Sequence, residues 1–346
     1  MRVVHVHRMR GIGGSERHLL TLLPALAERG VDVRFVGLDD PGWNVEPFYE
    51  ALAVPAERLT APWRLRRVLR RLRPDIVHTH LVHADVFGAL AVLGRRVRLV
   101  STKHNDDPFR AGPFRFAERV LTLRASKVIA ITEALRRFNV ERVGLPEAKI
   151  AVVHYGLDSA PEPWGPSPDL ALSPGARVLL CVCRLVPQKG VDVAVAALRS
   201  IREQHPDAAL VVLGEGPERP RLESEGVYLP GRVGDVASWY RRAEIVVHPV
   251  RWEGFGLALL EAMLAEKPVV ASRVSSVPEI VVDGQSGILV PPDDPAALAE
   301  AAIGLLDDPG RAAALGRAGL ARARREFSVA QMADRTLAVY AASDAR

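Results

Sequence analysis

Short runs rich in β-branched residues alternate with amphipathic stretches along almost the whole of this chain. Strands that alternate with helical patterns are typical of βαβ units, in which parallel strands form a buried sheet. The alternation therefore predicts an α/β fold built on parallel sheets. The runs are RVVHVH, VDVRFVG, DIVHTH, VRLVST, KVIAIT and KIAVVH in the first half, and RVLLCVC, AALVVLG, GVYLP, EIVVHP, KPVVAS and GILVP in the second.

A segment dense in Pro, Gly and Ser, GLDSAPEPWGPSPDLALSPG at 156–175, interrupts this alternation. The 346 residues are enough for two domains with full cores. We therefore expect a Rossmann-like domain at 1–158, a linker at 159–175 and a second Rossmann-like domain at 176–327. Two doubly wound domains facing a central cleft would bind a ligand beyond the carboxyl ends of their strands.

Composition favours a cytoplasmic protein. The chain has no apolar run of about 18 residues, and its start, MRVVHVH, lacks a signal-peptide pattern. Cys181 and Cys183 lie two apart in a strand-like run, where a disulfide is geometrically awkward, so both are expected to be small buried apolar residues. Peripheral attachment to the inner face of a membrane stays open as an alternative.

Positive charge is concentrated in two arginine-rich stretches, RLRRVLRRLR at 64–73 and FRAGPFRFAERVLTLR at 109–124, although the net charge is only +5. The simpler interpretation is a solvated helix face. The alternative is a surface for an anionic partner, either membrane headgroups or nucleic acid. Since neither stretch has a stacking-aromatic pattern or a known binding motif, we expect no nucleic-acid partner.

A glycine-rich turn, VHRMRGIGGSERHLL at 6–20, follows the first expected strand and opens a helix. Gly13 and Gly14 allow the backbone to approach a ligand closely, and Ser15 could cap the helix, whose first amides favour anions. The stretch is not G-x-G-x-x-G, and an acidic ribose partner is not evident after the second strand. By itself this turn is a weak signal, and a plain strand-to-helix turn is the alternative.

Two cations occupy the matching position in the second half, within CRLVPQKGVD at 183–192. Arg184 and Lys189 lie in a strand–turn–helix loop, and Gly190 leaves room near the helix start. Cations at this spacing can clamp a diphosphate. Ordinary surface charges are the alternative.

Two carboxylates lie eight positions apart in VRWEGFGLALLEAML, 250–264. Glu253 precedes a helix expected to begin near Gly256 and run through Ala265, and the amides of Phe255, Gly256 and Leu257 at its positive end can approach a phosphate or a sugar hydroxyl. Glu261 lies about a turn and a half into the helix, among apolar neighbours that make a solvent-facing position unfavourable. A ligand spanning both carboxylates would carry hydroxyls at each end and phosphates between, which is the layout of a nucleotide sugar.

These features together resemble the retaining glycosyltransferases of the GT4 family, which have the GT-B fold. The resemblance rests on GIGGSER, CRLVPQKG, LGEGP, GRV, EGFGLALLE and EKPVVASRVSSVPEIVVDGQSGILVPPDD, and it covers nearly the whole chain. It implies transfer of a sugar from a UDP- or GDP-linked donor to a hydroxyl acceptor, which could be a glycan, a lipid-linked sugar or a small metabolite. It also implies that a final helix, within 328–346, crosses back to complete the first, acceptor-side domain, and that the domains hinge during turnover.

The resemblance also implies roles for individual residues. Glu253 would contact the donor sugar, Glu261 the ribose, and Arg184 with Lys189 the diphosphate. The backbone near Val233 would meet the nucleobase, and His104, at the end of the fourth expected strand, would touch the donor sugar. The sequence departs from the family at Glu266 and Lys267, where A-x-G-x-P is common, and we expect only local geometry to change.

We expect no requirement for a metal or a cofactor, because the side chains of Arg184 and Lys189 would stabilise the departing diphosphate. The resemblance implies a same-face reaction in which the leaving phosphate takes the acceptor proton. HTHLVH offers His78, His80 and His83 as a metal alternative, and His80 is also a candidate for the acceptor side. His5 and His7 lie within the first strand and are expected to be packed.

Three other interpretations remain open at this point. The first is a nucleotide-sugar epimerase of GT-B fold. The second is a nicotinamide-dependent oxidoreductase, which the missing fingerprint and ribose acid disfavour. The third is a non-enzymatic, basic protein that binds nucleotides or membranes.

Overall fold

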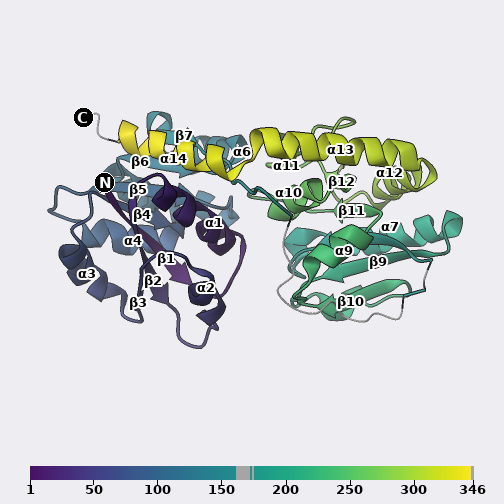
Figure 1. Ribbon diagram of the computed structural model, residues 1–346, viewed down its shortest axis with the longest axis horizontal. Coiled ribbons are helices and arrows are strands. Elements are labelled where there is room, and N and C mark those ends of the chain that lie inside the picture. The colour runs from purple at the N-terminus through teal and green to yellow at the C-terminus, as the bar shows by residue number, and fades with distance from the viewer. Residues whose placement is uncertain (161–171, 174, 344–346) are drawn as a thin grey trace. The chain divides into compact units, whose positions relative to one another are not determined.

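The computed structural model describes residues 1–160, 172–173 and 175–343 (Figure 1). The chain divides into two compact units. The first is Met1–Gly156 together with the chain from Ser328 onward, and the second is Leu157–Phe327. The predicted linker, 159–175, falls mostly outside the described residues.

The first unit is built on a seven-stranded parallel sheet in the order β3-β2-β1-β4-β5-β6-β7. Strand order reverses between β1 and β4, and such a switch point leaves a crevice beyond the carboxyl ends of the two strands. The strands are β1 Arg2–Met9, β2 Asp32–Asp39, β3 Ala56–Leu59, β4 Ile76–His80, β5 Arg98–Lys103, β6 Lys127–Ala130 and β7 Ile150–Val152.

Helices that connect the parallel strands cover both faces of the sheet in this unit. One core cluster unites α1 with α14, and a second unites α3 and α4 with the opposite face. The helices are α1 Gly14–Glu28, α2 Glu46–Ala51, α3 Leu65–Leu72, α4 Leu81–Ala91, α5 Arg115–Arg124, α6 Glu133–Arg137 and α14 Val329–Ala342. Turns of 3-10 or π-helix are η1 Pro62–Arg64, η2 Pro108–Ala111, η3 Phe138–Val143 and η4 Glu147–Lys149.

Helix α14 belongs to the first unit although it ends the chain, and Figure 1 shows it in yellow beside the purple and blue elements. Its apolar side packs into the cluster that also holds Leu19, Leu22 and Phe35. Tyr340 is fully buried, and its hydroxyl lies 2.7 Å from Nδ1 of His78. The C-terminal helix is therefore part of the core of this unit.

The second unit is built on a six-stranded parallel sheet in the order β10-β9-β8-β11-β12-β13. The strands are β8 Arg177–Val182, β9 Ala208–Leu213, β10 Val227–Gly231, β11 Ile245–His248, β12 Val269–Ser272 and β13 Ile288–Val290. The helices are η5 Pro187–Lys189, α7 Val191–Gln204, α8 Arg219–Leu222, α9 Val236–Arg242, α10 Leu257–Leu264, α11 Val277–Ile280, α12 Pro295–Asp307 and α13 Pro309–Glu326.

The predicted α/β architecture of two Rossmann-like parallel sheets is confirmed. The sequence pattern missed β3, whose residues AERL alternate between half-buried and exposed at the edge of the sheet. A short, half-polar edge strand has no β-branched run to mark it. No helix among the described residues is both long and apolar enough to cross a membrane.

In the turn between α10 and β12, Glu266 occupies the position where the GT4 pattern A-x-G-x-P commonly has glycine. Glu266 has φ +58, in the left-handed region that favours glycine, and its carbonyl closely approaches Gly316 of α13. A non-glycine residue in this conformation costs about 1–2 kcal/mol. The sequence departure is thus a local strain at this turn.

Candidate active site

Three loops of the second unit meet at the carboxyl ends of β8, β9 and β11. Gly190, with φ +59, lies so close to β11's end that an added Cβ would be 2.0 Å from the carbonyl oxygen of Pro249. A Cβ on Gly214, after β9, would lie 1.8 Å from the carbonyl oxygen of Cys183. Glycine is needed at both positions because the loops pack backbone against backbone.

The centre of this region is a cluster of Lys189, Glu253 and His248. Oε2 of Glu253 lies 2.5 Å from Nζ of Lys189 and 3.2 Å from Nε2 of His248. The Glu253 side chain is 12% exposed and that of Lys189 is 13% exposed. Two segments that are 64 positions apart in the chain therefore bring opposite charges together at a partly open position.

The protonation states of this cluster follow from its environment. Burial alone would raise the pKa of Glu253, but the Lys189 ammonium and the His248 hydrogen bond outweigh it and hold that pKa well below its usual range. Burial lowers the pKa of His248, although Glu253 opposes the shift. Near neutral pH the pair is thus a carboxylate and a neutral imidazole. Because a carboxylate only accepts hydrogen bonds, Nε2 of His248 carries the proton.

Side chains from elsewhere in the unit hold the Glu253 loop. Ser276, fully buried, donates its hydroxyl hydrogen toward the carbonyl oxygens of Glu253, at 2.9 Å, and Phe255, at 3.1 Å. Gln188 donates from Nε2 to the carbonyl oxygen of Trp252 at 2.9 Å. Sequence reasoning missed Ser276, Gln188 and His248. The sequence marks them only by position: Gln188 lies within R-x4-K, Ser276 lies just before P-E-I-V, and His248 lies within E-I-V-V-H-P.

The start of α10 presents backbone rather than side chains. Gly256 is the N-cap, with φ +101, and Leu257 is the first helical residue, as the sequence predicts to within one position. The Phe255 side chain is 2% exposed and packs edge-on against Phe327, with ring centroids 5.9 Å apart. Phe255 can therefore offer a ligand only its backbone.

Glu261 is buried on α10, with 4% of its surface exposed. The hydroxyl of Tyr240, on α9, donates to its Oε2 at 3.0 Å and also lies 3.2 Å from the carbonyl oxygen of Ala258. The apolar neighbours of Glu261 predicted that it would not face solvent, but sequence reasoning missed Tyr240, which fixes the carboxylate.

The remaining predicted residues of this unit differ in exposure. Arg184 is exposed, and its guanidinium makes no hydrogen bond or ion pair with any residue that the structure describes. Val233 is 7% exposed in the loop between β10 and α9. Arg184 is thus a cation available to a ligand, whereas Val233 can offer mainly its backbone.

In the first unit, Gly13 and Gly14 are exposed at the start of α1. Gly13, not Ser15, is the N-cap, and its amide donates to Oε2 of Glu16 at 2.9 Å, which is the half of a capping box that a glycine N-cap can make. Ser15 lies inside the helix, where its hydroxyl is 3.1 Å from Nε2 of His7. The expectation that Ser15 caps this helix is wrong, because Glu16 performs that role from the third position.

His104, after β5, is 8% exposed, and both of its ring nitrogens have protein partners. Nδ1 is hydrogen-bonded to the Tyr155 hydroxyl, and Nε2 lies 3.0 Å from Nδ1 of His80. A sugar hydroxyl could bond to this ring only by replacing one of these two partners.

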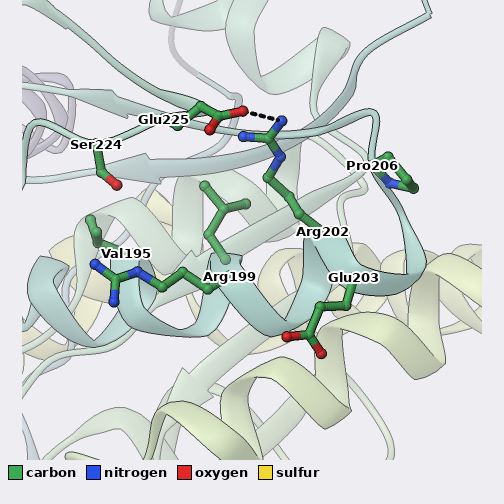
Figure 2. A pocket seen from close by; sticks show the side chains of 8 residues that line it. Val195, Arg199, Arg202, Glu203, Pro206, Ser224 and Glu225 are labelled. Atoms are coloured by element: carbon green, nitrogen blue, oxygen red, sulfur yellow. Dashed lines mark ion pairs between the residues drawn. The ribbon is translucent and has the colours of Figure 1, made fainter.

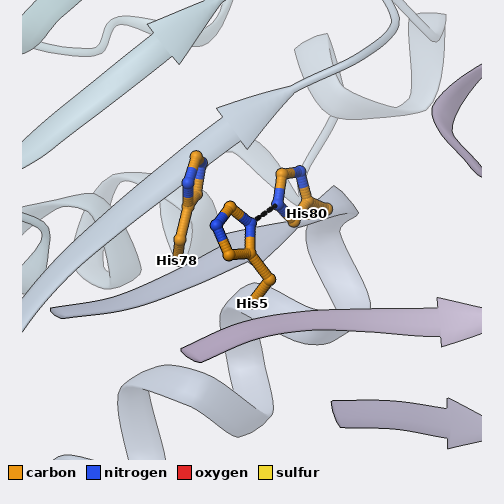
Figure 3. Close-up of side chains that lie close together, drawn as sticks. All are labelled: His5, His78 and His80. Carbon is orange, nitrogen blue, oxygen red and sulfur yellow. Dashed lines mark hydrogen bonds between the residues drawn. The ribbon is translucent and has the colours of Figure 1, made fainter. Parts of the chain in front are cut away.

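His104 ends a buried chain of hydrogen-bonded rings that includes His5, His78 and His80 (Figure 3). His80 continues to Nδ1 of His5 at 3.0 Å, and His5 continues to the Tyr340 hydroxyl at 3.3 Å. His78 joins Tyr340 at 2.7 Å and Thr102 at 2.6 Å. Each imidazole nitrogen in this chain is satisfied by a neighbour.

His5, His78 and His80 are spaced like metal ligands in the described chain, since one nitrogen from each ring lies within 4.8 Å of the others. His83, the third residue of the H-x-H-x2-H alternative, is instead exposed on α4. The H-x-H-x2-H spacing therefore does not identify the observed cluster, because its third histidine is His5 on β1 and not His83. Hydrogen bonds within the protein already account for the donors and acceptors of all three.

Acid should destabilise this unit through its buried histidines. Burial lowers the pKa of His18, which stacks on Tyr155 with centroids 4.2 Å apart, to about 3. Since the unfolded value is higher, its stabilisation is present above about pH 6.5 and is lost as pH falls toward 3. At pH 5 the loss should be about 2 kcal/mol for this one group. His18→Phe keeps the stacked ring without the titration, so urea unfolding at pH 7.5 and 5.0 should show a smaller acid loss in the variant. An equal loss in both proteins would contradict this.

A hollow of about 430 Å³ lies beside α7, where Arg202 pairs with Glu225 at 3.0 Å (Figure 2). It is lined by Pro206, just before β9, and by Ser224, just before β10. These residues lie at the amino ends of the strands. The hollow is therefore at the edge of the sheet opposite to Lys189 and Glu253, and we do not assign it to the donor.

Known proteins match the chain over nearly all of its length. The family model described as glycosyl transferases group 1 matches residues 176–308, and that of glycosyltransferase family 4 matches residues 12–160. An α-maltose-1-phosphate synthase of Mycolicibacterium smegmatis is 30% identical over 95% of each chain. A glycogen synthase of Mycobacterium tuberculosis is 31% identical over 84% of this chain and 75% of its own length.

A crystal structure of HepE from Anabaena, in complex with UDP and glucose, shares the fold. Its TM-score is 0.84, with 22% identity and 99% of both chains covered. A sucrose-phosphate synthase from Thermosynechococcus elongatus has a TM-score of 0.81 at 21% identity, over 99% of this chain and 98% of its own. These relatives do not favour the epimerase, oxidoreductase or non-enzymatic interpretations. The chain belongs to the GT4 family of glycosyltransferases and has the GT-B fold.

Proposed function

We propose that this glycosyltransferase takes a sugar from a UDP- or GDP-linked donor and attaches it to a hydroxyl acceptor with retention of configuration and without a metal. The observation that carries the proposal is the Lys189–Glu253–His248 cluster at the carboxyl ends of β8 and β11. HepE, which shares the fold, has been crystallised with UDP and with UDP-glucose. That likeness supports a nucleotide-sugar donor for the second unit.

The proposed donor follows the line of polar groups in this unit. Arg184 and Lys189 bind the diphosphate, assisted by the backbone at Gly256 and Leu257, at the positive end of α10. Glu261, held by Tyr240, accepts hydrogen bonds from the ribose hydroxyls. The backbone at Val233 meets the base.

The chemistry is charge separation between the sugar and the departing diphosphate. As the bond to the anomeric carbon breaks, negative charge grows on the phosphate and positive charge on the sugar. Lys189 and Arg184 stabilise the first charge, and the ionised Glu253 lies next to the second. The acceptor oxygen then forms its bond to the anomeric carbon on the face that the diphosphate leaves, and the acceptor proton passes to the leaving phosphate.

The first unit is assigned the acceptor. Its exposed Gly13 and Gly14 allow close approach of a ligand to the backbone. His104 would contact the donor sugar after exchanging its bond with Tyr155 for one with a sugar hydroxyl. The acceptor itself is a hydroxyl of a glycan, a lipid-linked sugar or a small metabolite.

A screen of donor hydrolysis across UDP- and GDP-linked sugars tests this proposal and names the donor. Thermal unfolding in the presence of UDP, GDP or NAD gives the binding side of the test, because a ligand that binds the folded state raises the unfolding temperature. Stabilisation by a nucleoside diphosphate with release of the free sugar supports the transferase. Stabilisation by NAD alone would contradict it.

Turnover should continue in excess EDTA. The positive charges that stabilise the diphosphate, Arg184 and Lys189, are part of the chain, so a chelator removes nothing that the reaction needs. We expect the rate with EDTA to equal the rate with added Mg²⁺ or Mn²⁺. Loss of turnover with EDTA and its recovery with Mn²⁺ would disprove the metal-independent mechanism.

A further inference from the structure

Helix α5 of the first unit turns an apolar stripe outward and two polar side chains inward, although Leu121 packs against the core as in an ordinary surface helix. Glu118 and Thr122 point inward and are 1% and 3% exposed. Phe116, Val120 and Leu123 point outward and are 57%, 64% and 67% exposed. A surface helix normally turns its apolar stripe to the core, so this outward stripe needs a physical explanation.

Buried ion pairs fix this orientation. Glu118 lies 2.5 Å from Nη2 of Arg110 and 3.0 Å from Nζ of Lys103, and Lys103 also pairs with Asp85 at 2.6 Å. Burial would raise the pKa of Glu118, but Lys103 and Arg110 outweigh it and lower that pKa. Rotating α5 to bury its apolar side would separate these charges and leave them buried without partners, which is strongly unfavourable. The outward apolar stripe is therefore held in place from within.

The neighbouring helices of the same sheet face also expose apolar side chains. Helix α4 packs against both α3 and α5. At its C-terminal end Leu90 is 58% exposed and Leu93, just beyond it, is 45% exposed, while Trp63 in η1 is 77% exposed. We call this surface the α3–α5 face, defined by Trp63, Leu90, Leu93, Phe116, Val120 and Leu123. Apolar side chains gathered in this way on a soluble surface mark an interaction site.

The exposed charges on the three helices of the α3–α5 face are all positive. Helices α3, α4 and α5 contain seven arginines, and their only acidic residues are Asp85 and Glu118, both buried in ion pairs. Arg67, Arg70 and Arg124 are exposed and have no carboxylate partner within the described residues. The face therefore combines outward apolar side chains with unpaired positive charge.

We propose that the α3–α5 face docks on the surface of an anionic lipid bilayer. Phe116, Val120 and Leu123 would enter the interface, and the arginines would contact lipid phosphates. The guanidiniums of Arg115 and Arg119 lie 4.9 and 5.7 Å from the Phe116 ring, so cations already flank the ring that would be inserted. Long arginine side chains can keep their charge at the headgroups while their stems lie along apolar surface.

Charge and side-chain type separate this partner from two others. A nucleic acid would satisfy the arginines but leave the aliphatic Val120 and Leu123 without stacking partners. A second copy of the chain, related by a two-fold axis, would bring this face against itself and place arginine against arginine. An anionic bilayer satisfies both the apolar and the positive groups.

The test is flotation of the purified full chain with vesicles of phosphatidylcholine alone or with about 30% phosphatidylglycerol added. We expect binding to the anionic vesicles only. Salt at 0.5 M should weaken this binding, because it screens the attraction between the arginines and the lipid phosphates. Combining Phe116→Ser, Val120→Ser and Leu123→Ser should weaken vesicle binding by about tenfold or more, given the loss of three inserted apolar side chains. Donor hydrolysis by this variant should be unchanged, which shows that it has folded.

The matched control combines Arg311→Ala with Arg317→Ala, two exposed arginines of α13 in the second unit. This pair lowers the net positive charge without touching the α3–α5 face, so vesicle binding should persist. Failure of the wild-type chain to float with anionic vesicles would overturn the proposal, as would equal loss of binding in the control. A wild-type dimer that the triple serine variant dissociates, without vesicle binding, would show that the face joins two copies instead.

Discussion

Replacing Lys189 with methionine should lower kcat by about 100-fold or more, the scale of losing one charge-stabilising group. Methionine keeps the length of the side chain but removes the ammonium that lies 2.5 Å from Glu253. Without that charge, burial is less opposed and the pKa of Glu253 should rise. The acid limb of the pH–rate profile should therefore move to higher pH in the variant.

Arg184→Ala and Lys267→Met complete this experiment. Arg184 is exposed and has no partner in the described chain, so its loss should reduce kcat in the same direction without changing the unfolding temperature. Lys267 donates to the carbonyl oxygen of Arg241, at the end of α9, and its replacement should leave kcat unchanged. Full activity of Lys189→Met or Arg184→Ala, with the fold intact, would remove the diphosphate clamp from the mechanism.

Glu253→Gln and Glu261→Gln should have opposite signatures. Glu253 is assigned to the sugar, where charge develops, so its variant should lose kcat strongly. Its affinity for the free nucleoside diphosphate should be unchanged or tighter, because Lys189 loses its carboxylate partner. Glu261 is assigned to the ribose, so its variant should raise the donor KM and the Kd of the free nucleoside diphosphate together, by about 10-fold or more for a hydrogen bond to a charged group.

Calorimetry with UDP and GDP, alongside steady-state kinetics, measures both signatures. Tyr240→Phe is a useful companion, because it removes the hydroxyl 3.0 Å from Glu261 while leaving the carboxylate charge. We expect it to weaken nucleotide binding less than Glu261→Gln does. If Glu253→Gln weakened free-nucleotide binding as much as Glu261→Gln, the placement of sugar and ribose would be reversed or wrong.

The parts of the fold with a strong local pattern could be predicted. The alternation of β-branched runs and helices predicted both parallel sheets, and the start of α10 was placed within one residue. The edge strand β3 could not be recognised, since its AERL sequence is short and half polar. The N-cap of α1 was misplaced because Glu16 accepts a hydrogen bond from the Gly13 amide, so a glycine can begin the helix without a side-chain cap.

Sequence motifs predicted individual residues of the site but not the contacts between them. Lys189 and Glu253 were singled out separately, but their ion pair joins segments 64 positions apart, and no local pattern shows that. Ser276 and Tyr240 also act through contacts between distant positions, 23 and 21 residues apart, whereas His248 lies only five positions from Glu253. The burial of Glu261 was the exception, since its apolar neighbours along one helix carry that information.

The hydrogen-bonded rings of the first unit also have a direction. Each link between His104, His80 and His5 joins Nδ1 of one ring to Nε2 of the next. A neutral imidazole has one hydrogen to donate, so one ring's tautomer sets the next, and Tyr340 passes the choice on to His78. All four rings must share a single tautomer, either Nε2–H or Nδ1–H. A group at Tyr155 that only donates or only accepts would thus decide whether Tyr340 donates its one hydrogen to His5 or to His78 at the other end of the core.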